Sequence, residues 1–206
     1  MILLDFSQTM IGSFMAMGKG SIVVEEDLLR HTVLNSIRQY KHQFRHVDHG
    51  VFFICCDSPK NWRKESFPEY KANRKKRRET DSTDWTSLFE FLHQMIADLR
   101  EYFPYKVMRV EGAEADDIIA VLTQEEMKNP TTIISSDKDF IQLQKYEGVQ
   151  QWSPLTKSFV KGNPEESLWE KLIKGDVGDG VPNILSSDDT LVTEGKRQRP
   201  VSKKKM

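Results

Sequence analysis

Apolar residues recur along the chain with two spacings, which together predict a series of strands and helices. Between Glu25 and Phe44 they return every three or four positions, as on the buried face of a helix. Val51–Cys56 is instead a short continuous apolar run, typical of a buried strand. The predicted strands are Ile2–Phe6, Val51–Cys56, Tyr105–Val110, Thr131–Ser135 and Val149–Trp152. The predicted helices are Glu25–Phe44, Asp84–Tyr102, Ala113–Met127, Asp137–Leu143 and Pro164–Lys174.

The alternation of strands and helices predicts an α/β fold with a mostly parallel central sheet and helices on both faces. We expect residues 1–160 to form this core, with a basic insertion at residues 58–83. Residues 161–185 should begin a helical region. From residue 186 to 206 no apolar periodicity remains and the chain ends in a basic run, so this segment is predicted to be disordered.

Composition narrows the class of protein but not its partner. The 206 residues carry 30 Lys and Arg against 31 Asp and Glu, so the net charge of -1 favours no partner. The adjacent Cys55 and Cys56 lie in an apolar strand, where they act as small buried residues rather than as a disulfide. This cysteine usage suits a reducing compartment. No apolar run approaches the ~20 residues that a membrane helix needs, and we expect no membrane association.

Carboxylates follow most of the predicted strands. They are Asp5, Asp57, Glu114, Asp116, Asp117, Asp137 and Asp139, and Asp176 and Asp179 could approach from a later glycine-rich loop. Any one of them is more simply read as a helix cap. As a set, however, they meet at the carboxyl edge of the sheet, where their repulsion would favour protonation unless cations neutralise them. Oxygen ligands indicate Mg²⁺ or Mn²⁺, and a pair of such ions can cleave a phosphodiester.

A basic stretch with interleaved aromatic residues follows Asp57. Its cations are Lys60, Arg63, Lys64, Lys71, Arg74, Lys75, Lys76, Arg77 and Arg78, and its aromatic residues are Trp62, Phe67 and Tyr70. This combination favours a single-stranded nucleic-acid backbone with stacked bases. A solvated loop or a nuclear-localisation signal is the alternative. We call residues 60–78 the arch, and we expect it to be mobile in the absence of DNA because it holds few apolar residues and many like charges.

Three other functions share part of this pattern. A receiver or haloacid-dehalogenase-like phosphotransfer domain also has an aspartate after a strand, but the phosphatase needs Asp-x-Asp where this chain has Asp5-Phe6-Ser7. A PIN-type ribonuclease shares the acids but would lack the arch and the glycine-rich loop. A DNA-binding fragment without activity is the third alternative. Cleavage measured against binding alone would separate that fragment from an enzyme.

Four motifs resemble the signatures of the 5′-nuclease superfamily, which includes flap endonucleases, the 5′-nuclease domain of bacterial DNA polymerase I and phage 5′-exonucleases. The motifs are Tyr70-Lys71-Ala72-Asn73-Arg74, Glu114-Ala115-Asp116-Asp117, Ser136-Asp137-Lys138-Asp139 and the loop from Gly175 to Asn183. Ile134-Ser135-Ser136-Asp137 and Gln151-Trp152-Ser153-Pro154 resemble the phage RNase H branch in particular. The resemblance runs from Ile2 to about Asn183.

The resemblance implies a role for each matching residue. The metal-binding acids would be Asp5, Asp57, Glu114, Asp116, Asp117, Asp137, Asp139, Asp176 and Asp179, which together hold two Mg²⁺ ions that Mn²⁺ can replace. The candidate catalytic residues are Lys71, Arg74 and Asp137. The candidate DNA-binding residues are Arg63, Lys64, Tyr70, Lys71, Arg74 and Lys75, with Tyr70 at a stacking position.

The resemblance also implies the substrate and the setting. The substrate would be DNA or an RNA–DNA hybrid with a 5′ flap or single-stranded end, cut during removal of RNA primers in replication. The protein would act as a monomer in the cytoplasm of an infected bacterial cell, with a phage clamp and a single-strand-binding protein as possible partners. After Asn183 the family's duplex-gripping Gly-x-Gly-Lys-like run is absent. We therefore expect a truncated helical DNA-binding region and weaker binding to duplex DNA.

Overall fold

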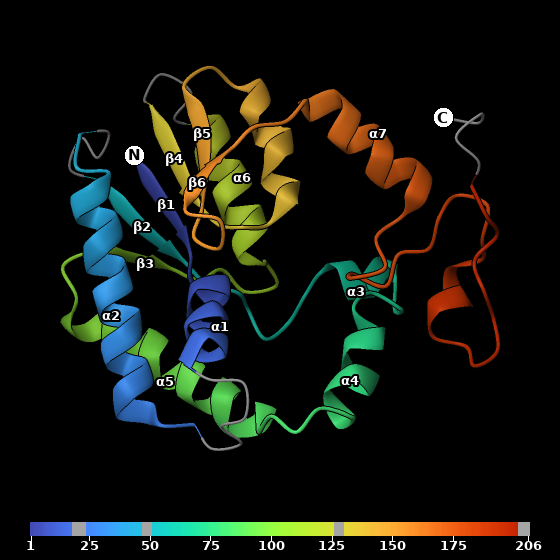
Figure 1. The fold of residues 1–206 in the computed structure, drawn as a ribbon, viewed down its shortest axis with the longest axis horizontal. Helices are drawn as coiled ribbons and strands as arrows, with labels where there is room; N and C mark the ends of the chain where they lie inside the picture. The colour runs from blue at the N-terminus through green and yellow to red at the C-terminus, as the bar shows by residue number, and fades with distance from the viewer. Residues whose placement is uncertain (18–23, 47–50, 126–129, 202–206) are drawn as a thin grey trace.

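A six-stranded sheet forms the centre of the protein (Figure 1). The computed structural model describes residues 1–17, 24–46, 51–125 and 130–201, without the side chains of residues 76 and 77. The strand order is β3-β2-β1-β4-β5-β6, and β6 alone runs antiparallel to its neighbour. The strands are β1 (Ile2–Asp5), β2 (Phe52–Cys55), β3 (Lys106–Met108), β4 (Thr131–Ile134), β5 (Val149–Ser153) and β6 (Ser158–Val160).

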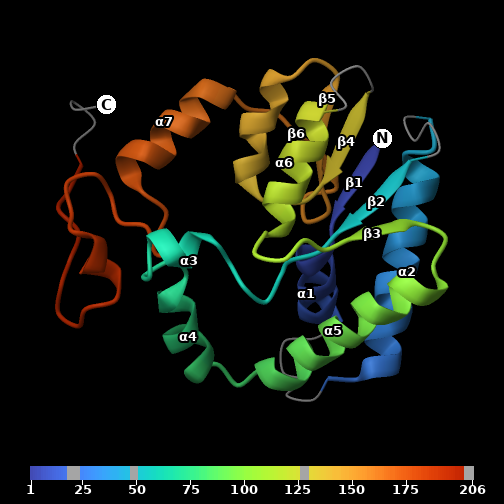
Figure 2. The same ribbon diagram turned by 180° about the vertical axis from the view of Figure 1, so that it is seen from behind.

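Helices cover both faces of the sheet, as predicted (Figures 1 and 2). One face packs against α1 (Phe6–Met17), α2 (Glu26–Gln43) and α5 (Trp85–Tyr102). The other face packs against α6 (Ala115–Glu125) and the 3₁₀ helix η1 (Lys138–Lys145). The remaining helices are α3 (Arg63–Ser66), α4 (Ala72–Glu79), α7 (Pro164–Lys174) and η2 (Asp188–Leu191). The predicted fold class is therefore confirmed.

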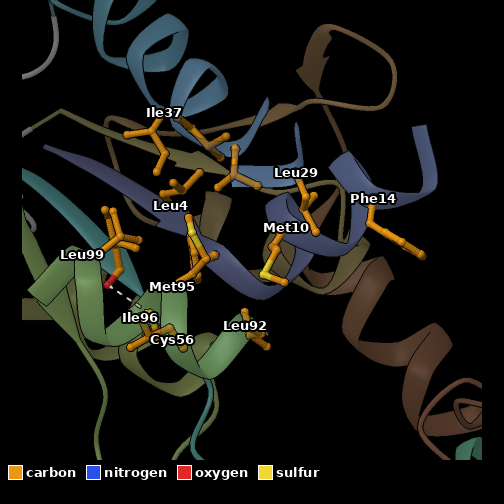
Figure 3. Packing of buried hydrophobic residues seen from close by; sticks show 14 of the residues in the cluster. Leu4, Met10, Phe14, Leu29, Ile37, Cys56, Leu92, Met95, Ile96 and Leu99 are labelled. Atoms are coloured by element: carbon orange, nitrogen blue, oxygen red, sulfur yellow. Dashed lines mark hydrogen bonds between the residues drawn. The ribbon is translucent and has the colours of Figure 1, made fainter. Parts of the chain in front are cut away.

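The pleat of the strands assigns neighbouring residues to opposite cores. Leu4 packs with Met10, Leu29 and α5 on one face (Figure 3). Leu3 packs with α6 on the other face. Cys56 and Cys55 divide in the same way, and both are free thiols. Strands that are buried on both faces carry apolar residues at successive positions. This explains why the sequence shows continuous apolar runs rather than alternating apolar and polar residues.

Several elements differ from the sequence prediction, which included none of the helices α1, α3, α4 and η2 and not the strand β6. Helix α1 was not predicted, although Phe6, Met10 and Phe14 are spaced by four and are all buried. The helix after Asp137 is 3₁₀ rather than α. Strand β6 follows a turn at residues 154–157 and pairs only with β5, so its short run gave little signal.

Hydrogen bonds link Asn183 to the segment that follows it. The Asn183 backbone amide donates to Gln198 Oε1 at 2.7 Å, and its side-chain amide donates to the Arg199 carbonyl at 2.7 Å. Thr190 is buried. In this structure polar contacts rather than an apolar face hold residues 186–201, and the predicted disorder of residues 186–206 stays a prediction. Residues 202–206 lie outside the described part of the chain, and within the described part no helix has the length and hydropathy of a membrane span.

Hydrogen bonds join the arch to the 175–183 loop, and the expected mobility of the arch stays a prediction. The Lys71 amide donates to the Asp179 carbonyl at 2.7 Å, and the Asn73 side chain donates to the Val177 carbonyl at 2.6 Å. Gly180 packs closely against the backbone of the arch beside the Lys71–Asp179 hydrogen bond, and its φ is +77°. The expectation of mobility considered only apolar contacts, whereas backbone and polar side-chain bonds form this interface.

Substituting Gly180 by alanine should release the arch. The added Cβ would lie 2.8 Å from the Glu69 carbonyl oxygen, and the left-handed backbone would itself cost about 1–2 kcal/mol. We expect limited proteolysis to cleave the arch faster in Gly180→Ala than in the native protein. Gly12→Ala is the control, because nothing lies within 4 Å of its added Cβ. Equal cleavage of the arch in all three proteins would show that this contact does not restrain it.

Candidate active site

Four carboxylates from different parts of the chain lie near one another at the carboxyl edge of the sheet. We call them the inner acids: Asp5, Asp57, Asp116 and Asp137. Burial, followed by the charge of Asp57, raises the pKa of Asp5 to about 7. Burial, followed by the charges of Asp5, Asp137 and Asp57, raises the pKa of Asp116 to about 8. The mutual repulsion expected from the sequence is therefore present in the fold.

Local hydrogen bonds hold three of the inner acids in place. Asp5 accepts from the Gln8 amide at 3.1 Å and from the Ser135 hydroxyl at 3.0 Å. Asp57 accepts from the backbone amide at the start of α6 at 2.7 Å, which joins the ends of β2 and α6. Asp137 caps η1 by accepting from the Asp139 amide at 2.9 Å. Capping and site-building are thus compatible roles for the same carboxylate.

A second set, the outer acids, is paired with cations. Its members are Glu114, Asp139, Asp176 and Asp179. Lys71 Nζ lies 2.6 Å from Glu114, and Arg74 Nη2 lies 2.6 Å from Asp179. Both cations come from the arch, so the arch reaches the acidic edge of the sheet.

The cations offset the cost of burying these carboxylates. Burial alone would raise the pKa of Glu114, but hydrogen bonds from Lys71 and Tyr70 outweigh it and hold that pKa below its ordinary value. At Asp176 burial alone would also raise the pKa, but the hydrogen bond from Lys171 outweighs it and the pKa is lowered. At Asp139 burial prevails over Lys171, and the pKa is raised. The outer acids are thus neutralised internally to different degrees.

The donor set suits divalent cations. The inner and outer acids offer only carboxylate oxygens, which Mg²⁺ and Mn²⁺ prefer. Within the described residues, no three Asp, Glu, His or Cys side chains already stand in a chelating arrangement. Like charges without a neutralising ion keep side chains apart, and this repulsion adds to burial in raising the pKa values of Asp5 and Asp116. The arrangement is a convergent acidic site that a cation would draw together.

Asp117 departs from the predicted ligand set. Its carboxylate forms a two-point ion pair with Arg63, at 2.7 and 2.8 Å, and accepts from the Glu114 amide at 2.9 Å. It is also within hydrogen-bonding distance of the Trp62 indole. Residues adjacent on a helix point about 100° apart, so Asp116 faces the inner acids while Asp117 anchors α3. Asp117 therefore has a structural role in this structure.

The arch residues predicted to bind DNA fall into two groups. Tyr70 is buried, and its hydroxyl lies 2.7 Å from Glu114 and 3.0 Å from Asp179; its stacking on DNA stays a prediction. Arg63 is engaged by Asp117, as described above. Lys64 and Lys75 are exposed, and neither forms an ion pair within the described residues. The two exposed lysines remain predicted DNA contacts.

Lys171 is a site residue that the sequence prediction did not include. Its ammonium lies 2.7 Å from Asp139 and contacts Asp176 directly. The available signal was its position on a predicted helix that runs straight into the acidic 175–183 loop. A lone lysine in a mixed-charge helix is normally a solvated residue, which is why it was not selected.

The stability of the metal-free protein should fall as the pH rises from 5 to 8. The folded-state pKa values of Asp5 and Asp116, about 7 and about 8, lie above their ordinary value of 3.8, so the folded state binds more protons in this range. The stabilising contribution is complete below the ordinary value and is lost as the pH passes the folded values. Thermal unfolding in EDTA should show a lower Tm at pH 8 than at pH 5, with a smaller difference in Asp116→Asn. A Tm in EDTA that is constant or rises over this range would contradict the repulsion argument.

Comparison with known proteins identifies the family. Residues 1–172 match the family described as 5′-3′ exonuclease, N-terminal resolvase-like domain. Ribonuclease H of Enterobacteria phage T4 is 36% identical over 98% of this chain and 68% of that protein. Flap endonuclease Xni of Shewanella sp. (strain MR-4) is 27% identical over 60% of this chain and 48% of that protein.

Solved structures show the same fold. The phage T5 D15 protein co-crystallised with metal ions has a TM-score of 0.71 at 18% identity, over 89% of this chain and 68% of that one. The T5 D15 flap endonuclease in a complex with DNA and metal ions has a TM-score of 0.70 at 19% identity, over 89% and 69%. This chain therefore belongs to the 5′-3′ exonuclease family and is a 5′ nuclease, a hydrolase of phosphodiester bonds.

Proposed function

We propose that this chain is a Mg²⁺-dependent 5′-3′ exonuclease and flap endonuclease that uses two ions and accepts Mn²⁺ in place of Mg²⁺. One observation carries the proposal: the inner acids lie at the same sheet edge as the two arch cations, Lys71 and Arg74. A phosphodiester needs both partners, since divalent ions require the acids and the phosphate requires positive charge. The metal-bound T5 D15 structure supports the choice of divalent ions.

We expect the inner acids and the outer acids to bind different metal ions. The inner acids would hold one ion, and Asp139, Asp176 and Asp179 would hold the other. When bound, the ions supply an activated water and a charge that stabilises the leaving oxygen. Ser135 and the amide at the start of α6 orient Asp5 and Asp57, so that these carboxylates are already directed toward the sheet edge.

The arch would contribute its cations through an exchange of partners. In this structure Lys71 and Arg74 are engaged by Glu114 and Asp179. Once divalent ions neutralise the acids, the ammonium and guanidinium groups can turn to the oxygens of the scissile phosphate. Arg74 suits a two-point contact with phosphate, whereas Lys71 acts as a mobile point charge.

The substrate we propose is DNA, or an RNA–DNA hybrid, with a 5′ flap or single-stranded 5′ end. The T5 D15 complex with DNA supports nucleic acid as the ligand. The name of the T4 relative, Ribonuclease H, supports cleavage of RNA primers. We propose action as a monomer in the cytoplasm of an infected bacterial cell, alongside a phage clamp and a single-strand-binding protein.

Cleavage of matched flaps tests this function. A duplex with a labelled 5′ flap of RNA or DNA, and a blunt duplex of the same sequence, are incubated with the protein in Mg²⁺, Mn²⁺ or EDTA. We expect cleavage near the flap junction in both metals and none in EDTA, with the blunt duplex cut more slowly. Binding of the flap without cleavage in either metal would support the inactive-fragment alternative instead.

A further inference from the structure

Lys171 connects two outer acids that belong to different parts of the fold. It lies on α7, one turn before the helix ends at Lys174. Its Nζ is 2.7 Å from Asp139 Oδ1 on η1 and contacts Asp176 Oδ2 in the 175–183 loop. Both acids are among those proposed above to hold the second ion. The ammonium therefore occupies the space between two proposed ligands.

The backbone of the loop fixes one side of this contact. Asp176 Oδ1 accepts from the amides of Gly178 and Asp179, at 2.8 and 3.2 Å, which leaves Oδ2 directed at Lys171. Gly175 permits the close approach of its own backbone to Pro182, since a Cβ on residue 175 would lie 2.4 Å from the Pro182 carbonyl group. The carboxylate is held in one orientation whether a lysine or another cation faces it.

The two sets of acids differ in how they are neutralised. Within the described residues, no lysine or arginine forms an ion pair with any of the inner acids. Asp139 and Asp176, in contrast, share one ammonium. A divalent ion that enters the inner set therefore displaces no lysine or arginine, only protons, whereas one that enters between Asp139 and Asp176 meets a cation already in place.

We propose that Lys171 is an internal counter-cation that stands in for the second metal ion and must be displaced when that ion binds. The inference rests on the proposed two-ion site. Asp179, the third acid proposed for this ion, is already paired with Arg74. Asp139 and Asp176 together carry two negative charges, which a divalent ion balances alone, so retention of the Lys171 ammonium beside it would leave an excess positive charge. Lys171 thus holds the metal-free site together and at the same time weakens its affinity for the second ion.

Calorimetric titration of the DNA-free protein with Mn²⁺ tests the proposal without reference to activity. Lys171→Met removes the ammonium while keeping much of the side-chain length. Lys174→Met is the matched control, because Lys174 lies on the same helix but pairs with the exposed Glu170. We expect the weaker class of Mn²⁺ sites to tighten by about tenfold in Lys171→Met. The tighter class should be unchanged, and Lys174→Met should bind as the native protein does.

Thermal unfolding in EDTA gives the second readout. Lys171→Met should have a lower Tm than Lys174→Met in EDTA, and saturating Mn²⁺ should remove the difference. Lys171→Gln, which removes the charge but keeps a polar group, keeps the test valid if the methionine variant does not fold, and its Mn²⁺ affinity should rise as well.

Two results would count against the proposal in different ways. Weaker or unchanged Mn²⁺ binding in both Lys171 variants would overturn the counter-cation role alone. No saturable Mn²⁺ binding by the native protein would contradict the proposed function, and this inference with it.

Discussion

Asp137→Asn is expected to lower Mg²⁺-supported flap cleavage roughly a thousandfold while leaving the fold intact. Asparagine keeps an oxygen that can accept the Asp139 amide, so η1 should remain capped. It removes one negative charge from the inner acids, however, and an amide is a weaker ligand for Mg²⁺ than a carboxylate. Single-turnover cleavage of a 5′ flap, with unfolding measured alongside, would record both parts of the prediction.

Asp27→Asn is the matched control, because Asp27 is an exposed acid in the first turn of α2. It should cleave at the native rate. In EDTA, Asp137→Asn should be at least as stable as the native protein, since like-charge repulsion with Asp5 and Asp116 is relieved. Native cleavage rates in Asp137→Asn would remove this residue from the site.

Lys71→Met is expected to reduce flap cleavage about a hundredfold at saturating substrate. The ammonium is one of the two arch cations at the sheet edge, 2.6 Å from Glu114. Methionine fills similar space but supplies no charge to a phosphate. Single-turnover rates at saturating DNA separate this effect from loss of affinity.

Lys75→Met removes a cation from the exposed surface of α4, the arch helix that begins directly after Lys71. Its effect should appear in DNA affinity and salt dependence, with the cleavage rate at saturation unchanged. If both variants lose cleavage equally at saturation, or if neither does, the arch cations do not have the separate roles that their contacts indicate.

The strands and the acids that follow them could be predicted because each depends on a few consecutive residues. A buried run such as Ile2–Phe6 needs no knowledge of its neighbours, and parallel strands bring their carboxyl ends to one edge. The approximate position of Asp5, Asp57 and Asp137 follows from those two facts alone.

The orientation of individual side chains could not be predicted in the same way. Asp116 and Asp117 are adjacent in sequence, and only the rotation of α6 decides that one faces the inner acids and the other faces Arg63. Tyr70 reads as an exposed stacking residue until the 175–183 loop closes over it and engages its hydroxyl. Contacts between segments that lie 54 and 109 residues apart in the sequence decide these roles.

Contacts within polar segments also could not be predicted from the sequence. The arch and residues 186–201 lack apolar periodicity, yet backbone and side-chain hydrogen bonds hold both. A hydrogen bond formed across a loop leaves no periodic signal in the sequence. Lys171 belongs with these cases, because its role depends on which two acids the fold brings to it.

Anomalous scattering from a crystal of the native protein grown with Mn²⁺ tests the metal site most directly. The account predicts two peaks at the carboxyl edge of the sheet. One should lie among Asp5, Asp57, Asp116 and Asp137, and the other between Asp139 and Asp176, with the Lys171 ammonium moved away. The absence of any peak among the inner acids would contradict the assignment of this edge as a metal-dependent active site.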